Sequence, residues 1–231
     1  LLTGRERPIV LLLKKAISAQ VTGENNPYVG VMLPYTPLHA LLLDGISTPL
    51  VMTSGNYSGE PIIIDNADAL DKLTDIADAF LLHDRDIHVP CDDSVVRIVN
   101  HNELPIRRSR GYAPFPVKLN VDVPPVLAVG GELKNTFCLT RDNYAFMSQH
   151  IGDMENLETL TAFDRAVAHI KDLFRVEPQV VAHDMHPNYL STRWARESGL
   201  PLIAVQHHHA HIVGVMAEHK RSVDERVIGF S

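Results

Sequence analysis

Apolar and polar positions in the first half of the chain alternate in the manner of short strands and helices. Each apolar run has the length of a strand, and the run at 29–33 ends at a proline. We predict strands at 9–14, 29–33, 50–53, 94–99 and 103–107, the last two forming a hairpin across an Asn-His-Asn turn. Helical spacing predicts helices at 37–44, which has a proline in its first turn, and at 66–73.

The second half of the chain shows a longer and more regular alternation. At 156–174 the apolar residues recur every three or four positions, which is the spacing of an amphipathic helix. Further helices are predicted at 188–198 and 207–219. Strands are predicted at 126–130, 136–140, 144–148, 179–182, 202–205 and 227–230. Strands that alternate with helices of this length indicate a βαβαβ run in a parallel or mixed sheet.

Two proline-rich stretches separate these halves. Pro114 and Pro116 precede, and Pro124 and Pro125 follow, a segment with neither helical nor strand periodicity, so we predict a linker near 117–125. A length of 231 residues suits one large domain or two modest ones. The hydrophobic share of 45% and the charged share of 21% are those of an ordinary globular protein, which excludes disorder and coiled coil.

Charge and cysteine content exclude several classes of protein. A net charge of −7 is poorly suited to holding a nucleic-acid backbone. The longest apolar run, Ile9–Leu13, is far shorter than the ~20 residues of a membrane span. Cys91 and Cys138 are too far apart for a thiolate metal site and too few for a disulfide framework. We therefore expect a reduced, cytoplasmic protein without a signal peptide, a membrane partner or a nucleic-acid partner.

The strongest chemical signal is a cluster of four histidines that follows the predicted strand 202–205. His207 and His211 are four residues apart, so they lie on one helical face and can chelate one metal ion. Neutral imidazoles suit Zn, Fe or Ni better than Mg. His208 and His209 face elsewhere and could orient the pair or touch a substrate. The alternative is a polar helix start, which so dense a cluster of imidazoles disfavours.

A protein metal site needs at least a third ligand. Asp184 and His186 are candidates, because they follow the preceding predicted strand at the same edge of the sheet. A carboxylate beyond Ser231 is a further candidate.

Three other segments could bind anions, but each is a weak signal alone. Ser54, Gly55 and Asn56 form a small-residue turn after an apolar run, which suits either a phosphate or an ordinary cap. The basic residues at 107–110 could clamp phosphates, although a solvated charge run is the simpler interpretation. Residues 130–135 fit either a phosphate cradle or a plain β-turn. The sequence has no P-loop, GxGxxG or GxSxG motif.

Together, the motifs and their order resemble one family over essentially the whole chain. The resemblance lies in GVMLPYTPLH, MTSGN, CDDSVVR, RSRGY, GGELKN and DMHP, at residues 30–39, 52–56, 91–97, 108–112, 130–135 and 184–187, and in the histidine cluster. The family is HypF, the carbamoyltransferases of [NiFe]-hydrogenase maturation.

The resemblance implies an α/β fold of two domains. A YrdC-like mixed, twisted sheet with helices would occupy residues 1–119, followed by a linker at 120–125. Residues 126–231 would form the first lobe of a sugar-kinase/actin-type, TsaD-like domain.

The resemblance also implies an activity. In the family, the YrdC-like domain uses ATP to activate a carbamoyl group, which comes from carbamoyl phosphate, as carbamoyl-adenylate. The TsaD-like domain, which holds a metal, then passes the carbamoyl group to the C-terminal cysteine thiol of the partner HypE, en route to the cyanide ligands of the hydrogenase iron. For this chain the resemblance implies the same substrates and partner, Mg²⁺, and a divalent Zn or Fe ion at His207 and His211.

Nucleotide-binding residues follow from the same resemblance. Ser54 and Asn56 match the Ser-x-Asn motif of YrdC-like domains, and Ser94 and Arg108 match the family pattern more loosely. The resemblance assigns no catalytic residue.

Some parts of the family pattern are not in this chain. A Lys-x-Arg motif, an acylphosphatase-like domain and a zinc-finger region would precede Leu1, and the second lobe would follow Ser231. The chain also begins without Met, so we expect an internal piece of a longer enzyme that is inactive or nearly so alone. The alternatives are a threonylcarbamoyl-adenosine tRNA-modification protein and a non-catalytic metal- or nucleotide-binding scaffold.

Overall fold

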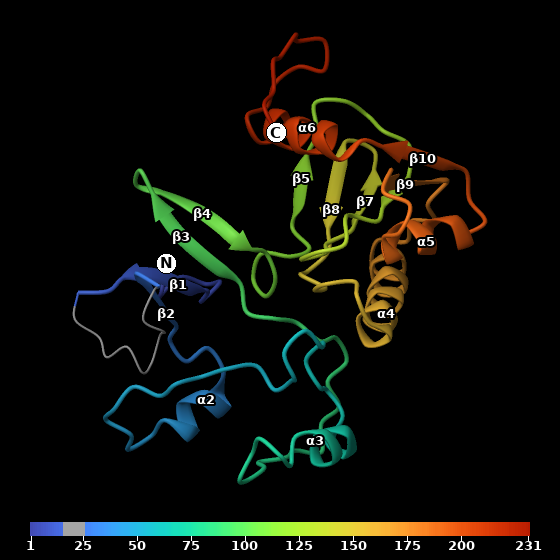
Figure 1. The fold of residues 1–231 in the computed structure, drawn as a ribbon. Coiled ribbons are helices and arrows are strands. Elements are labelled where there is room, and N and C mark those ends of the chain that lie inside the picture. Colours follow the sequence, from blue (N-terminus) through green and yellow to red (C-terminus); the bar gives the residue numbers. More distant parts are fainter. Residues whose placement is uncertain (16–25) are drawn as a thin grey trace. The chain divides into compact units, whose positions relative to one another are not determined.

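The computed structural model describes residues 1–15 and 26–231, which divide into two compact units (Figure 1). The first unit comprises Leu1–Asn56 and Ile62–Tyr112, and the second comprises Tyr57–Pro61 and Ala113–Ser231. Each unit has a sheet of its own.

The first unit is built on a four-stranded sheet in the order β2-β1-β3-β4. Its strands are β1 (Ile9–Leu13), β2 (Tyr28–Val31), β3 (Val95–Val99) and β4 (Asn102–Arg107). β1 is antiparallel to β2 and parallel to β3. The predicted hairpin joins β3 to β4, and Asn100 and His101 turn the chain with φ angles of 49° and 63°. Asparagine and histidine are among the residues that tolerate this left-handed conformation, so the polar turn fixes the hairpin.

Two short helices of the first unit begin at side-chain caps. In α2 (Pro37–Leu42) the Thr36 hydroxyl accepts the backbone N–H of His39. In α3 (Asn66–Lys72) the Asp65 carboxylate accepts two backbone N–H groups of the first turn. These caps explain why both helices begin where the sequence predicted.

Two of the predicted strands are wrong. Residues 50–53 are irregular, and the Val51 side chain is 75% exposed. Residues 227–230 are also irregular, and Phe230 is 94% exposed. Neither segment pairs with a strand of the two sheets, and an apolar run forms a strand only where a neighbour supplies hydrogen-bond partners.

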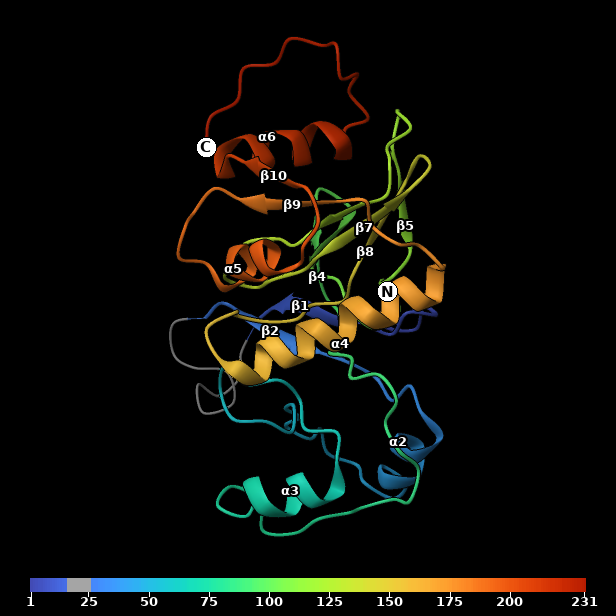
Figure 2. The same cartoon turned by 90° about the vertical axis from the view of Figure 1, so that its right-hand side faces the viewer.

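The second unit contains a six-stranded sheet in the order β10-β9-β6-β7-β8-β5 (Figure 2). Its strands are β5 (Pro116–Lys118), β6 (Val126–Ala128), β7 (Cys138–Arg141), β8 (Tyr144–Met147), β9 (Val180–Asp184) and β10 (Leu202–Val205). β6, β9 and β10 run parallel, whereas β7, β8 and β5 are antiparallel to their neighbours. The sheet is therefore mixed, which confirms the predicted class of fold.

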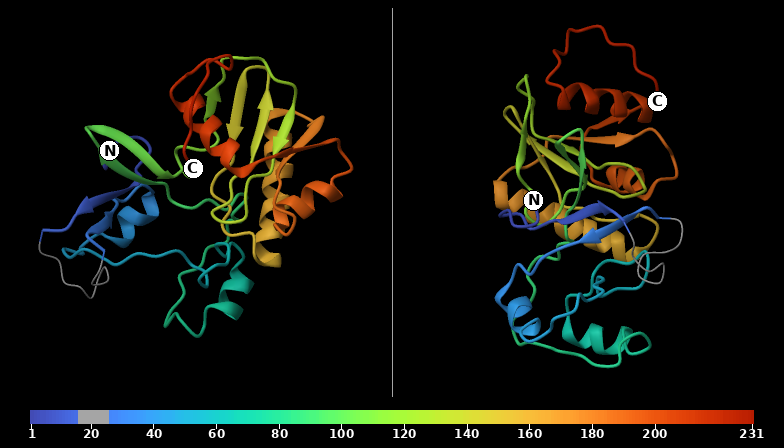
Figure 3. Two further views of the ribbon diagram at one scale, coloured as in Figure 1. Left: turned by 45° about the horizontal axis from the view of Figure 1, so that its top comes forward. Right: turned by 90° about the vertical axis from the view of Figure 1, so that its left-hand side faces the viewer.

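Three helices complete the second unit (Figure 3): α4 (Leu157–Phe174), α5 (Leu190–Glu197) and α6 (His207–Glu218). The Asn156 side chain caps α4 by accepting the Thr159 N–H at 2.7 Å, and the helix ends at Arg175 in a left-handed conformation. α5 connects β9 to β10, and α6 follows β10 directly. No helix in the described part of the chain is both long enough and apolar enough to cross a membrane.

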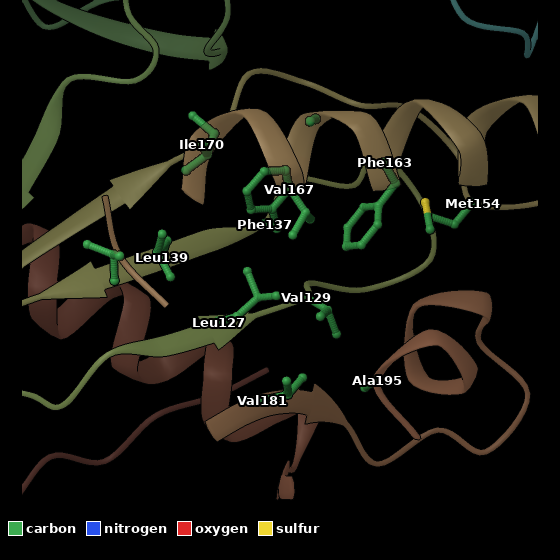
Figure 4. Packing of buried hydrophobic residues seen from close by; sticks show 12 residues of the cluster. Leu127, Val129, Phe137, Leu139, Met154, Phe163, Val167, Ile170, Val181 and Ala195 are labelled. Atoms are coloured by element: carbon green, nitrogen blue, oxygen red, sulfur yellow. The ribbon is translucent and has the colours of Figure 1, made fainter. Parts of the chain in front are cut away.

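The core of the second unit lies between α4 and the sheet (Figure 4). Phe163 and Val167 of α4 belong to the same buried cluster as Leu127 of β6. The Phe163 ring meets the rings of Phe137 and Trp194 edge to face, with centroids 5.4 and 5.2 Å apart. Edge-to-face contacts stabilise aromatic clusters beyond the burial of their area, so these rings hold α4 against the residue before β7 and against α5.

One strand lies in the proline-rich stretch between the halves. The prediction is a domain of residues 1–119 and a linker at 120–125; by compactness the chain divides between Tyr112 and Ala113. The reason is β5, which pairs with β8 and so joins the second sheet. A proline opens β5 at the edge of that sheet, where its missing N–H removes no hydrogen bond of the central ladder. This proline-rich stretch is therefore part of a sheet.

Candidate functional site

Three loops of the second unit leave its sheet at one edge. β6 leads into residues 130–135, β9 into residues 184–187, and β10 into α6 through Gln206. Because β6, β9 and β10 are parallel, these loops lie at the carboxyl ends of neighbouring strands, where α/β proteins bind ligands. All residues of the predicted metal site belong to this edge.

His207 and His211 lie at the beginning of α6, with their ring nitrogens facing each other. The two Nε2 atoms are 3.1 Å apart and the ring centroids 4.7 Å apart. Bonds of about 2.0–2.1 Å to one zinc or iron ion would set two imidazole nitrogens about 2.8–3.4 Å apart at tetrahedral or octahedral angles. The pair therefore fits two adjacent ligands of one divalent metal.

Asp184 fixes the orientation of His207. Its Oδ2 atom accepts a hydrogen bond of 2.6 Å from His207 Nδ1, and its Oδ1 atom accepts the His186 backbone N–H at 2.8 Å. Burial alone would raise the pKa of Asp184, but these hydrogen bonds and the neighbouring histidine charges lower that pKa below its usual value. The ionised carboxylate accepts the Nδ1–H of His207, so the Nε2 atom of His207 carries the lone pair that faces His211.

The structure gives neither Asp184 nor His186 the place of a third ligand. Asp184 contacts Nδ1 of His207, not the Nε2 that faces His211. The His186 ring stacks on Tyr189, with centroids 4.1 Å apart. Across residues 1–15 and 26–231, no three His, Cys, Asp or Glu side chains gather at one metal position. The described residues thus offer two candidate ligands and one orienting carboxylate.

The loop at 130–135 passes beside the histidine pair. Gly130 has a φ of +75°, and a Cβ there would lie 2.4 Å from the Thr136 carbonyl oxygen, so only glycine fits. A Cβ on Gly131 would lie 3.9 Å from Cε1 of His207. The two glycines therefore let the backbone turn sharply and lie close to the imidazole.

Asn135 holds this loop from the inside. Its side chain is 1% exposed, and its Nδ2 atom donates to the carbonyl oxygens of Val129 and Gly131 at 2.9 and 2.7 Å. An amide with both donor hydrogens engaged fixes the loop more firmly than an ordinary β-turn, which has one backbone hydrogen bond.

In the first unit, Ser54 and Asn56 lie in the irregular segment before α3. The Asn56 N–H donates to the Ser54 carbonyl at 3.2 Å, and the Gly55 carbonyl accepts the Ile63 N–H at 3.1 Å, which closes a compact turn. Ser54 is exposed and Asn56 is half-buried. The Ser54 hydroxyl is thus accessible to a ligand.

Ser94 and Arg108 lie next to each other at the open end of the β3–β4 hairpin. The Ser94 hydroxyl is fully buried, donates to the Arg110 carbonyl at 2.9 Å, and accepts the Ser109 N–H at 2.8 Å. Arg108 is half-buried, and its Nη2 atom donates to the Tyr112 carbonyl at 3.2 Å. Ser94 therefore joins the two strand ends, a structural role that the sequence did not indicate.

The sequence also did not reveal the role of Arg110. Its guanidinium lies 3.5 Å from the Tyr35 ring centroid and forms an ion pair of 2.9 Å with Asp93. It also donates to the carbonyl oxygens of Glu6 and Arg7 at 3.0 and 2.8 Å. An arginine with these partners is a structural anchor, so the interpretation of the basic cluster as a solvated charge run is wrong for this residue. The sequence indicated this role only indirectly. Tyr35, Asp93 and Arg110 all belong to motifs that carry the resemblance.

The fold and the site together define a class of protein with two α/β units, each built on a mixed sheet, and with paired histidines at the carboxyl edge of parallel strands in the second. Two family models match this division. The Sua5/YciO/YrdC model, described as "Telomere recombination", matches residues 1–109, and the model described as "HypF Kae1-like domain" matches residues 121–218. The chain belongs to the HypF carbamoyltransferase family.

Named relatives match over the whole chain. It is 49% identical to carbamoyltransferase HypF2 of Cupriavidus necator and 48% identical to carbamoyltransferase HypF of Synechocystis sp., each over 100% of this chain. The matched regions are 31% and 30% of those relatives, so the chain spans about a third of their length.

Two solved structures share the fold. A full-length HypF in the phosphate- and nucleotide-bound form has a TM-score of 0.92 and 53% identity, over 98% of this chain and 36% of that one. HypF from T. kodakarensis has a TM-score of 0.90 and 40% identity, over 95% of this chain and 30% of that one.

Proposed function

We propose that this chain is part of a carbamoyltransferase of [NiFe]-hydrogenase maturation. Its substrates are ATP and carbamoyl phosphate, and its acceptor is the C-terminal cysteine thiol of HypE. The observation that carries the proposal is the convergence of His207 and His211 Nε2, oriented by Asp184, in a chain nearly half identical to named carbamoyltransferases.

In this proposal the first unit activates the carbamoyl group. Carbamate is released from carbamoyl phosphate elsewhere in the enzyme. One of its oxygens attacks the α-phosphorus of Mg²⁺-bound ATP. The new P–O bond gives carbamoyl-adenylate, and pyrophosphate leaves. The Ser54 hydroxyl, the Asn56 amide and the Arg108 guanidinium bind phosphate oxygens and orient the nucleotide for this attack. Ser94 contributes by holding the strand end from which Arg108 extends.

The second unit transfers the activated group. The acceptor thiol loses its proton to solvent, its sulfur bonds to the carbamoyl carbon, and the carbon–oxygen bond to AMP breaks with AMP as the leaving group. His207 and His211 hold a divalent Zn or Fe ion, which when bound supplies positive charge at this edge. Asp184 keeps the His207 proton on Nδ1. The first turn of α6, which Gln206 does not cap, adds N–H groups that attract a phosphate.

The test is ATP–pyrophosphate exchange by a full-length protein that contains this chain, with carbamoyl phosphate present or withheld. We expect exchange only in the presence of carbamoyl phosphate. Replacing the nucleotide contacts (Ser54→Ala with Asn56→Ala) should lower it by about 100-fold. Ser58→Ala is the matched control, because this exposed serine lies just after the turn and outside the Ser-x-Asn motif.

Other outcomes would redirect the proposal. Exchange that needs threonine and bicarbonate would place the protein in tRNA modification. Absence of exchange, with metal still bound, would favour a binding scaffold. Transfer is tested with radiolabelled carbamoyl phosphate, whose label should reach HypE only when the C-terminal cysteine of HypE is intact.

A further inference from the structure

Glu132 belongs to the loop beside His207 but bonds to a different element. Its Oε2 atom accepts the Leu190 backbone N–H at 2.8 Å, 58 residues further along the chain. Leu190 opens α5, and the N-cap residue Tyr189 gives no side-chain hydrogen bond. Glu132 therefore caps α5 from another segment, with a carboxylate at the positive end of the helix.

A second hydrogen bond joins the same loop and helix. The Ser191 hydroxyl, on a fully buried residue, donates to the Gly130 carbonyl at 3.2 Å. One hydrogen bond uses a side chain of the loop and the other uses a side chain of the helix. Together they restrict rotation of the loop relative to α5.

α5 is in turn bonded to the strand end that orients the histidines. The buried Thr192 hydroxyl donates to the Asp184 carbonyl at 3.1 Å. Asp184 holds His207 through Nδ1, and the His207 ring lies beside Gly131. The hydrogen bonds therefore form a chain that leads from Glu132 through α5 and Asp184 to His207, whose ring lies near the loop at Gly131.

We infer that Glu132 is a positioning residue for the histidine pair, acting through the cap of α5 and the loop at 130–135. The inference rests on the proposed metal-binding role of that pair. Glu132 acts on the histidines indirectly, because its Oε2 atom accepts the Leu190 backbone N–H. Without this carboxylate, α5 loses its cap and the loop loses one of its two hydrogen bonds to α5, so the His207 ring is held less firmly against Asp184.

The test compares Glu132→Ala, Glu132→Gln and Glu132→Asp in the full chain with two readouts. The first is the NMR signal of the hydrogen-bonded His207 Nδ1–H in metal-free protein, assigned with His207→Gln. The second is the dissociation constant for Zn²⁺. We expect Glu132→Ala to weaken the signal and to raise the dissociation constant about tenfold, the size of effect seen for residues that orient metal ligands. Glu132→Gln keeps an acceptor oxygen and should stay close to the parent in both readouts.

Controls separate positioning from a general loss of stability. Glu158→Ala removes an exposed carboxylate of α4 that takes no part in these contacts, and it should change neither readout. Glu132→Asp keeps the charge but is one methylene too short to reach Leu190, so it should behave like Glu132→Ala and replaces that variant if the alanine chain does not fold. The inference is overturned if Glu132→Ala, or Glu132→Asp in its place, leaves both readouts unchanged, or if Glu132→Gln fails as they do. If the parent binds no Zn²⁺, the proposed metal role fails, while the NMR signal still decides the role of Glu132.

Discussion

The hydrogen bond between Asp184 and His207 decides which imidazole nitrogen carries the proton. The ionised carboxylate accepts from Nδ1, so Nε2 keeps its lone pair and faces His211. A pair of histidines at this spacing is common on helices. A carboxylate that accepts the Nδ1–H is the arrangement expected of a histidine that binds a metal through Nε2.

Asp184→Asn should therefore weaken metal binding without removing a ligand. The amide can still accept a hydrogen bond but carries no charge, so the proton on Nδ1 is held less strongly and Nε2 becomes a poorer ligand. We expect the dissociation constant for Zn²⁺ to rise about 10- to 100-fold in competition with a chromophoric chelator. Asp172→Asn, an exposed carboxylate of α4, is the control. Equal affinity of Asp184→Asn and the parent would show that the carboxylate does not act on the pair.

Glu132 gives the stability of the second unit a pH dependence of defined sign. Burial is the main cause that raises the pKa of Glu132 above its usual value, and Glu155 adds to it, while the Leu190 N–H, His186 and Arg193 act in the opposite direction. A group with a raised pKa in the folded state contributes stability that is full below the unfolded pKa. This contribution is lost as the pH rises through the folded pKa.

We therefore expect Glu132→Gln to gain melting temperature relative to the parent as the pH rises. The difference in melting temperature should be small at about pH 4, where Glu132 is largely protonated in both the folded and the unfolded chain, and larger at about pH 7. Melting temperatures of the two chains across this range provide the measurement. A difference in melting temperature that stays constant with pH would mean that burial does not raise the pKa of Glu132 enough to affect the stability of the chain.

The spacing of residues along the sequence was sufficient to predict that His207 and His211 lie on one helical face. It did not predict which side chains surround them. The i, i+4 relation lies within one helix, so it can be recognised in any sequence. Asp184 was a candidate ligand, because spacing does not say which nitrogen a carboxylate approaches. Arg110 was misjudged for the same reason: its partners Glu6 and Arg7 lie at the other end of the first unit's sequence.

At the scale of elements, the turn after β6 depends on one glycine. Gly130 combines a positive φ with a close approach to the carbonyl of Thr136. Gly199, after α5, has a similar φ of +73°, but a Cβ there would meet nothing within 4 Å. The two positions therefore separate the cost of the left-handed conformation from the cost of a steric clash.

Gly130→Ala should destabilise the chain clearly more than Gly199→Ala. Both variants introduce left-handed strain of about 1–2 kcal/mol, and only Gly130→Ala adds a clash with backbone that must move. Thermal unfolding of both chains measures the difference. Equal losses would mean that the turn after β6 relaxes without consequence.

Most elements could be predicted from the chain's own periodicity, because a hairpin or an amphipathic helix is defined by neighbouring residues. β3 with β4, β7 with β8, and α4 all lie where the pattern places them. The errors concern strands whose existence depends on a distant partner. Residues 50–53 lack such a partner, whereas the proline-rich residues of β5 find one in β8.

At the scale of the whole molecule, one fluorophore reports on one unit. The sequence contains a single tryptophan, Trp194, which packs against Phe163 in the core of the second unit. Its fluorescence therefore follows unfolding of the unit that carries the histidine pair.

Zn²⁺ should raise the temperature of the transition that Trp194 reports, and a chelator should reverse the shift. A ligand that binds only the folded state, at 100 times its dissociation constant, stabilises by about 2.7 kcal/mol. The double variant His207→Ala with His211→Ala should show no shift. A shift of the same size in that variant would mean that Zn²⁺ binds elsewhere.

The parallel pairing of β6 with β9 also sets the order in which the site is made. Val126 lies beside Val180, so the strands meet only after the long segment that contains α4 has folded back. Such non-local pairings form late in folding, since a long loop must close first. The histidines of α6 can come together in a short helix at any time, but Asp184, Gly131 and α5 reach them only when the sheet closes. In a newly made chain the histidines are therefore expected to be paired before Asp184 reaches and orients them.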